Sequence, residues 1–177
     1  MWDALSLYGG ITVLVASLFT LQMAWKRQNK AKAVVGNRDW VGKFMLKHKK
    51  WFPLALREVK AGTKESDWIL WVFPIPLTLA EDEIDILSAS RKEYCVPTAE
   101  EGIALILDEV FHKDLVEIMQ ALQHHGNPQR VFTSSIDRTM FRMSIDYLIG
   151  ILGENPEVLL QDQRLQDLLV FWRDQTA

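Results

Sequence analysis

The sequence predicts an all-α protein in which one N-terminal transmembrane helix precedes a compact multi-helix domain. Three observations indicate this fold class. Residues 4–25 carry no charged side chain, the later part of the chain repeats apolar residues at helical spacing, and no segment alternates convincingly between apolar and polar residues. Only the run WILWVFPIP, residues 68–76, could be extended. With 177 residues and 49% apolar content, the chain is long enough for one domain with its own core.

The uncharged run from Ala4 to Trp25 is long enough to cross a membrane. At about 1.5 Å per residue it reaches about 33 Å, and the hydrocarbon core of a bilayer is about 30 Å thick. Trp2 and Tyr8 near one end and Trp25 at the other suit the aromatic belts at the two interfaces. A signal peptide would carry basic residues before the run, but Asp3 stands there. A buried core helix is the other alternative, and such helices are seldom so long or so uniformly apolar.

Basic residues that follow the run predict its orientation. The positive-inside rule places the N-terminus outside and the rest of the chain on the cytosolic, matrix or stromal side. The same side chains are expected to contact anionic lipid headgroups, together with the interfacial tryptophan. This expected headgroup set comprises Trp25, Lys26, Arg27, Lys30 and Lys32.

Small residues along the run predict a helix that packs against other membrane helices, since small side chains allow close approach in lipid. The alternative is that they are tolerated filler. The expected packing set comprises Ser6, Gly9, Gly10, Ala16 and Thr20.

A basic segment separates the run from the soluble domain, so the expected domains are residues 1–27, 28–50 and 51–177. Residues 26–60 hold eleven Lys and Arg against two acidic residues, whereas residues 61–177 hold nine against twenty. The helical spacing of Trp40 and Phe44 predicts an amphipathic helix lying on the bilayer. Binding of nucleic acid is the alternative for basic and aromatic residues together, but no known nucleic-acid module accompanies them.

Helix start and stop signals divide the soluble domain. We expect a helix from Lys50 until Gly62 ends it, and a short acidic one from Thr78 through residue 88. Thr98 is expected to open a long helix that runs to residue 126. A further helix is expected over residues 136–152, and Asn155 is expected to cap the last one, which reaches residue 172.

The segment ALREVKAGTKESDWILWVFP, residues 55–74, resembles a bacterial and eukaryotic family catalogued as domain of unknown function 1810. The family signature is close to A-L-x-E-[LI]-[RK]-x-G-x-K-x-S-H-W-x-W-x-x-F-P. A weaker similarity continues through YCVPTAEEGIALIL and VFTSSIDRTMFRMSIDYL, so that it covers about residues 51–170. The resemblance implies a small all-helical domain without an established reaction. The signature residues in register are Ala55, Leu56, Glu58, Gly62, Lys64, Ser66, Trp68, Phe73 and Pro74.

The chain also departs from this family pattern. Asp67 stands where the family has His, Ile75 stands where a Gln is usual, and LTLAEDEID replaces a Gly-rich link. The N-terminal span is an addition to the pattern. These changes favour a structural use of the fold over catalysis.

Motifs for chemistry are scarce, and we expect no catalytic residue, no metal and no cofactor. The single Cys95 is expected to be a buried thiol. His124 and His125 are adjacent, so on a helix they point about 100° apart and do not grip one metal. Four carboxylates could bind a cation, although carboxylates are also expected in a first helical turn; they are Glu81, Asp82, Glu83 and Asp85.

A polar pocket is the expected site if the domain binds a ligand. Its members would be Lys64, Ser66, Trp68, Asp137 and Arg142. The alternative is that Asp137 lies near a helix start, as carboxylates often do, and that Arg142 forms an ion pair within the domain. For the aromatic segment 68–76, we expect a packed corner rather than a wedge in lipid or a catalytic loop.

These expectations combine into a single-pass accessory subunit of a larger membrane complex, without nucleic acid as a partner. An organellar energy-transducing complex, respiratory or photosynthetic, is the expected setting. Met1 directly before the run leaves no room for a cleaved presequence, which favours the mitochondrial inner membrane over the thylakoid membrane. Two alternatives remain: a membrane-tethered enzyme or small-ligand binder, and a scaffold that recruits a soluble partner through its acidic half.

Overall fold

The computed structural model describes residues 38–78, 89–159 and 162–176, which belong to one compact unit. These residues are helical and contain no strand, and a single β-bridge joins Pro76 to Val96. The predicted all-α, multi-helix domain is therefore confirmed. The helices are α2 (Arg38–Ala61), α3 (Ile69–Val72), α5 (Ala89–Lys92), α6 (Ala99–Ile106), α7 (Glu109–Gln123), α8 (Pro128–Val131), α9 (Ser135–Gly153), α10 (Pro156–Leu159) and α11 (Gln163–Thr176).

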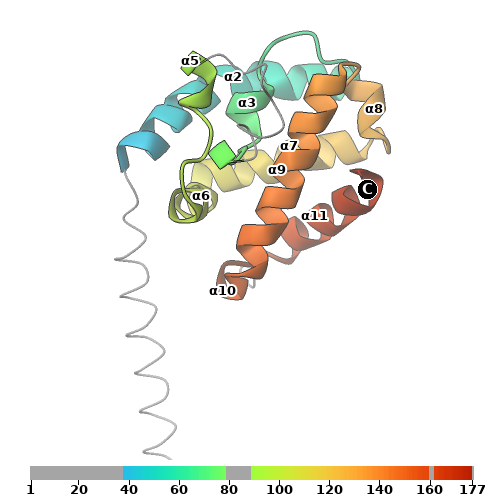
Figure 1. Cartoon of the computed structure of the whole chain (residues 1–177). Coiled ribbons are helices and arrows are strands. Elements are labelled where there is room, and N and C mark those ends of the chain that lie inside the picture. The colour runs from blue at the N-terminus through green and yellow to red at the C-terminus, as the bar shows by residue number, and fades with distance from the viewer. Residues whose placement is uncertain (1–37, 79–88, 160–161, 177) are drawn as a thin grey trace, which may run out of the picture. The chain divides into compact units, whose positions relative to one another are not determined.

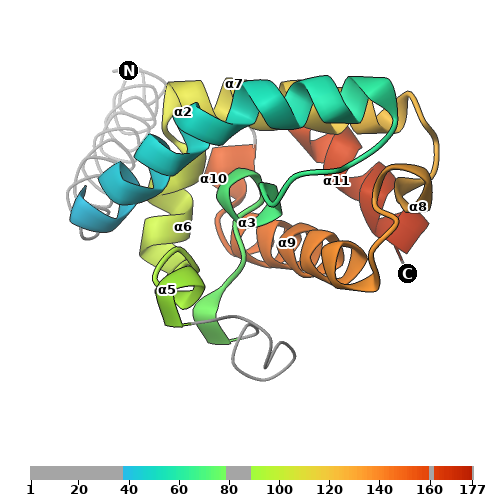
Figure 2. The same ribbon diagram turned by 90° about the horizontal axis from the view of Figure 1, so that it is seen from above.

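Helix α2 forms one wall of the domain and packs against α7 and α3 (Figures 1 and 2). It runs through residue 50, where a boundary between basic segment and domain was expected. Trp40 and Phe44 lie in the protein core with 7% and 0% exposure. An amphipathic helix resting on the bilayer through these two residues is therefore wrong, because the apolar side of α2 is covered by the rest of the domain. Gly62 ends the helix with φ of +81°, as expected.

A break at residues 107–108 divides the long helix expected after Thr98. Thr98 does cap the first part, since its hydroxyl accepts a hydrogen bond from the backbone N–H of Glu101 at 3.4 Å. Asp108 then caps α7, because its carboxylate accepts from the N–H groups of Val110 and Phe111 at 3.0 Å each. A single helix from 98 to 126 is therefore wrong. The apolar spacing continues across the break and conceals it.

Helix α9 crosses the domain and contacts α11, α3 and α6 (Figure 1). It covers the predicted range of residues 136–152. The expected last helix is shorter than predicted and is followed by a separate one: α10 ends at Leu159 and α11 begins at Gln163. Asp162 caps α11 by accepting from the N–H of Arg164 at 2.8 Å.

An aromatic cluster around Phe141 of α9 connects the helices. The Phe141 ring lies 5.0 Å from Phe73, 5.1 Å from Phe132 and 5.4 Å from Trp172, measured between ring centroids. All four side chains are fully buried. Such packed aromatic pairs add stability beyond the apolar area they bury.

The transmembrane helix expected at residues 1–27 lies outside the described residues, with its small and interfacial side chains. The acidic segment 79–88 also lies outside them. Within residues 38–78, 89–159 and 162–176, no helix is both long and apolar enough to cross a membrane.

Truncation of Phe141 tests the packing of this cluster. We expect Phe141→Ala to lower the free energy of unfolding by about 3–5 kcal/mol, because it leaves a cavity between three aromatic rings. The exposed Val170→Ala on α11 should change it by less than about 0.5 kcal/mol. Urea unfolding of the full chain in mild detergent, followed by circular dichroism, measures both. Equal losses in the two variants would contradict this account of the core.

Candidate functional site

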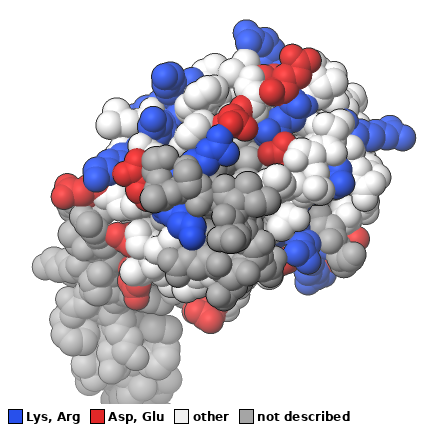
Figure 3. All heavy atoms as spheres, turned by 45° about the horizontal axis from the view of Figure 1, so that its top comes forward, with Lys and Arg blue, Asp and Glu red and all other residues white. Residues whose placement is uncertain are grey.

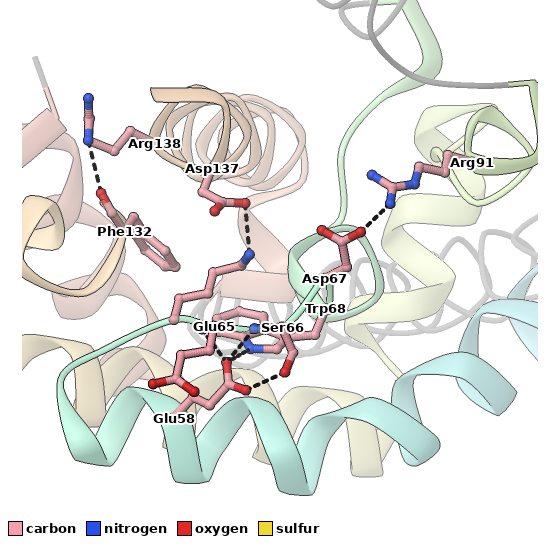
Figure 4. A network of polar contacts seen from close by, with 10 residues as sticks. Glu58, Glu65, Ser66, Asp67, Trp68, Arg91, Phe132, Asp137 and Arg138 are labelled. Atoms are coloured by element: carbon pink, nitrogen blue, oxygen red, sulfur yellow. Dashed lines mark hydrogen bonds and ion pairs between the residues drawn. The ribbon is translucent and has the colours of Figure 1, made fainter. Parts of the chain in front are cut away.

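The carboxylate of Glu58, in the last turn of α2, holds the loop that follows this helix. It accepts hydrogen bonds from the backbone N–H groups of Glu65 and Ser66 at 2.9 and 3.1 Å. It also accepts from the Ser66 hydroxyl at 2.5 Å and from the indole N–H of Trp68 at 2.7 Å. Figure 4 shows these donors converging on one side chain. Gly62 makes this possible because its positive φ turns the chain back onto the helix.

These contacts keep Glu58 ionised although it is buried. Burial by itself would raise the pKa of this carboxyl. The hydrogen bonds from the Ser66 hydroxyl, the Glu65 N–H, the Trp68 indole and the Ser66 N–H outweigh burial and lower the pKa from its ordinary value of 4.5 to about 2. The charge is thus balanced by four donors, and no basic side chain among the described residues pairs with it. Both oxygens of this carboxylate accept hydrogen bonds from the loop, so its role is to hold the loop in place.

A buried ion pair links the same loop to α9. Lys64 Nζ lies 2.9 Å from Oδ1 of Asp137, and the side chain of Lys64 is only 5% exposed. The ammonium group also lies 5.3 Å from the centroid of the Trp68 ring, within the range of a cation–π contact. The backbone N–H of Lys64 donates to the carbonyl of Val131 at 3.0 Å. Backbone and side chain of one residue therefore join the loop to two later segments.

A cleft of about 330 Å³ opens beside this ion pair, between α3, α5 and the start of α9. Asp67 and Arg91, which line it, form an ion pair with each other that is more exposed than the Lys64 pair. In the middle of the face seen in Figure 3, basic and acidic side chains lie next to each other. The cleft is lined by Lys64, Glu65, Asp67, Ile69, Leu70, Trp71, Arg91, Thr133, Ser134, Ile136, Asp137 and Met140.

The structure brings together four of the five residues expected to form a pocket, but in two groups. Lys64 and Asp137 line the cleft. Ser66 and Trp68 do not line the cleft and are hydrogen-bonded to Glu58 instead. Arg142, farther along α9, is exposed and does not line the cleft. The ion pair between Lys64 and Asp137 joins two members of the set directly.

The aromatic segment 68–76 forms the packed corner that was expected. Trp68 and Phe73 are fully buried, and the two prolines that follow them in the chain, Pro74 and Pro76, are buried. Trp71 is half-buried, and its ring stacks on Trp51 with 5.0 Å between the centroids. The segment is built from the short helix α3 and an extended stretch bridged to Val96.

The two adjacent histidines at the end of α7 differ in their surroundings. His124 is exposed, as expected for a solvated helix end. His125 is half-buried, and its Nε2 lies 2.7 Å from the carbonyl oxygen of Val59 in α2. It thus satisfies a carbonyl in the last turn of that helix, a partner that sequence reasoning missed.

Sequence reasoning also missed a buried histidine in α2. His48 is fully buried, with Nδ1 3.0 Å from the carbonyl oxygen of Trp71 and Nε2 3.1 Å from Oδ2 of Asp114. Burial lowers the pKa of His48, although the two acceptors oppose this effect. His48 lies four residues from both Phe44 and Phe52, which places it on the apolar side of α2. This spacing is the sequence signal that could have predicted its burial.

A second hollow, of about 280 Å³, lies where α7 meets the chain before α11. His112 Nε2 is 2.9 Å from Oδ2 of Asp162, and this hydrogen bond lowers the pKa of the carboxyl. Asp162 also caps α11. Among the described residues, no cluster of three or more His, Cys, Asp or Glu is arranged to hold a metal ion.

Fold and site together define a small all-helical domain in which buried polar contacts hold the loop after one long helix. The chain belongs to the family described as protein of unknown function, DUF1810, whose model matches residues 21–161. The resemblance seen in the sequence is thereby confirmed. The match begins well before residue 51, in keeping with an α2 helix that starts at Arg38. No curated protein and no solved structure matches the chain.

Neutralising Glu58 tests whether its charge holds the loop. We expect Glu58→Gln to lower the free energy of unfolding at pH 7 by about 3 kcal/mol, because an amide NH₂ would face groups that themselves donate. Glu65→Gln is the control. The side chain of Glu65 is exposed in the same loop, and this residue contacts Glu58 through its backbone N–H. It should change the value by less than about 0.5 kcal/mol.

The stability difference between the wild-type protein and Glu58→Gln depends on pH in a defined way. Since the pKa of Glu58 is lower in the folded state, its stabilisation is fully present above pH 4.5 and is lost as the pH falls toward 2. The depression corresponds to about 3 kcal/mol. The stability difference between wild type and Glu58→Gln should therefore shrink across this window, measured by urea unfolding. A difference that stays constant with pH would contradict the assignment.

Proposed function

We propose that this protein is a single-pass accessory subunit of a larger membrane protein complex, to which it contributes packing and assembly rather than catalysis. The setting we favour is an organellar energy-transducing complex, respiratory or photosynthetic. The mitochondrial inner membrane is preferred, and the thylakoid membrane is the alternative. The helical domain would then lie on the matrix or stromal side, with anionic lipid headgroups and other membrane subunits as partners.

One observation supports this proposal most directly: the polar residues of the family signature are engaged in contacts within the domain. Glu58 is occupied by four donors, and Lys64 is paired with Asp137. The cleft position where the family has His carries Asp67, which is paired with Arg91. Side chains whose polar groups are used within the domain in this way are suited to holding its structure. The uncharged run of residues 4–25 supplies the expected anchor.

The migration of the native protein tests the subunit proposal. After extraction with a mild detergent, we expect the protein to migrate in native electrophoresis with other subunits, well above the size of its own 20.4 kDa chain in detergent. Mass spectrometry of the excised band identifies these subunits. A recombinant chain produced alone in the same detergent is the size control. Comigration of the native protein with that control would overturn the proposal.

A second candidate function is binding of a small ligand in the cleft beside Lys64. The observation that favours it is the cleft itself, of about 330 Å³, with a buried ammonium group and the start of α9 at its wall. Pockets of about 300–1,000 Å³ are typical for small molecules. An anionic metabolite would take the place of Asp137 as the partner of Lys64, near the N-terminus of α9.

A thermal-shift screen of the full chain in detergent tests this second function. Nucleotides and phosphorylated metabolites form the panel, and a ligand should raise the unfolding temperature by several degrees. Thr133→Trp, which places a large side chain in the cleft lining, should abolish the shift. Thr63→Trp, at an exposed position outside the lining, should preserve it. A panel without any shift, or a shift that survives Thr133→Trp, would contradict ligand binding at this place.

A further inference from the structure

The solvent side of α2 carries a continuous basic face, which we define by Lys43, Leu46, Lys49, Lys50 and Arg57. All five side chains are exposed, whereas the opposite side of the helix is buried against the domain. The first four are spaced by three and four residues, and Arg57 follows Lys50 by seven, so all five lie along one face of the helix. The stretch between Asp39 and Glu58 contains no other acidic residue, and Glu58 is buried. Asp39, four residues before Lys43, is the one exposed acidic residue of α2, so the face carries an excess of basic charge.

Three of these basic side chains are not used by the folded domain. Lys43, Lys49 and Arg57 form no ion pair and no hydrogen bond with any other described residue. By contrast, Lys60 in the last turn of α2 pairs with Glu117 of α7 at 3.2 Å. The ammonium group of Lys50 lies over the ring of Trp51, 5.7 Å from the ring centroid. Lys60 thus has a partner within the folded domain, whereas Lys43, Lys49 and Arg57 do not.

An exposed leucine lies in the middle of this basic face. Leu46 is 74% exposed, the highest value among the large apolar side chains of the described residues. It is followed at spacings of three and four by Lys49 and Lys50, and preceded at three by Lys43. An apolar side chain that inserts between headgroups, surrounded by lysines whose ammonium groups reach phosphates, is a typical interfacial arrangement.

The position of α2 in the chain keeps this face near the membrane, an argument that rests on the proposed membrane anchor. Residues 26–37 separate the end of the uncharged run from Arg38, and even when fully extended they reach no more than about 40 Å. They carry four further basic residues. Attraction to anionic lipid falls off within about a Debye length, so a short tether favours contact.

We propose that the basic face of α2 docks on an anionic lipid surface, with Leu46 inserted among the headgroups. This differs from the expected amphipathic helix, in which Trp40 and Phe44 would face lipid. Those rings face the domain core, and the lipid-facing side is the opposite one. Docking of this face would set the orientation of the whole domain, because α2 packs directly on α7 and α3.

Cysteine labelling of the full chain in vesicles tests this docking. Leu46→Cys adds one exposed thiol, and the native Cys95 is buried with 1% exposure. The chain is reconstituted in phosphatidylcholine alone or in phosphatidylcholine with phosphatidylglycerol, and a charged maleimide is added. We expect labelling to be several-fold slower in the vesicles that contain phosphatidylglycerol, and to recover in high salt. Val170→Cys, on α11, is the matched control and should react equally in both.

Charge reversal then tests whether the basic face is responsible. Lys43→Glu, Lys49→Glu and Arg57→Glu together should abolish the protection of Leu46→Cys by phosphatidylglycerol. Reversal of three exposed residues elsewhere, Lys113→Glu, Arg130→Glu and Arg164→Glu, changes the net charge equally and should preserve protection. Equal labelling of Leu46→Cys in the two kinds of vesicle would overturn the proposal. So would protection that survives the first triple variant or is lost in the second.

The labelling experiment tests the docking face independently of the accessory-subunit proposal. The vesicles contain no other subunit, so labelling does not depend on membership of a complex. Washing the vesicles with alkaline carbonate reports on the anchor by itself. A chain that is released by carbonate, yet protected at Leu46→Cys before the wash, would keep the docking face and refute the anchor. A chain that resists the wash without protection would keep the anchor and refute the docking.

Discussion

The domain depends on one buried carboxylate. Glu58 gathers four hydrogen-bond donors from the loop that reverses direction at Gly62, and it remains ionised because those donors outweigh the cost of burial. Without this acceptor, the indole N–H of Trp68 and two backbone N–H groups would lose their partner in the interior. The loop in turn places Lys64 against Asp137, and this ion pair connects α2 to α9.

This arrangement separates structural chemistry from surface chemistry. The signature residues that most resemble a site, including Lys64 and Ser66, are directed at partners inside the domain. On the outside of α2, Lys43, Lys49 and Arg57 have no such partners among the described residues, whereas Lys60 pairs with Glu117. Surfaces rather than clefts are therefore the more promising places for function in this chain. An accessory subunit is expected to act through such surfaces.

Much of the fold could be predicted from local signals, and the misses have physical causes. Periodicity located α9, and the cap at Thr98 and the stop at Gly62 were placed correctly because each is a local backbone effect. The break before Asp108 was missed because apolar spacing continues through it. In the site, Lys64 and Asp137 both line the cleft, whereas Arg142 does not, since the rotation of α9 decides which of its side chains face the cleft.

The sequence by itself determined the all-helical class, the range of α9, the uncharged run, the separation of basic and acidic halves and the family. Each of these follows from spacing, composition or motif, which are properties of neighbouring residues. Only the tertiary structure decided that Trp40 and Phe44 face the core, and that Leu46 lies on the outside among lysines. It also decided which charges are neutralised. The reason is that periodicity defines the two sides of a helix, while distant segments determine which side they cover.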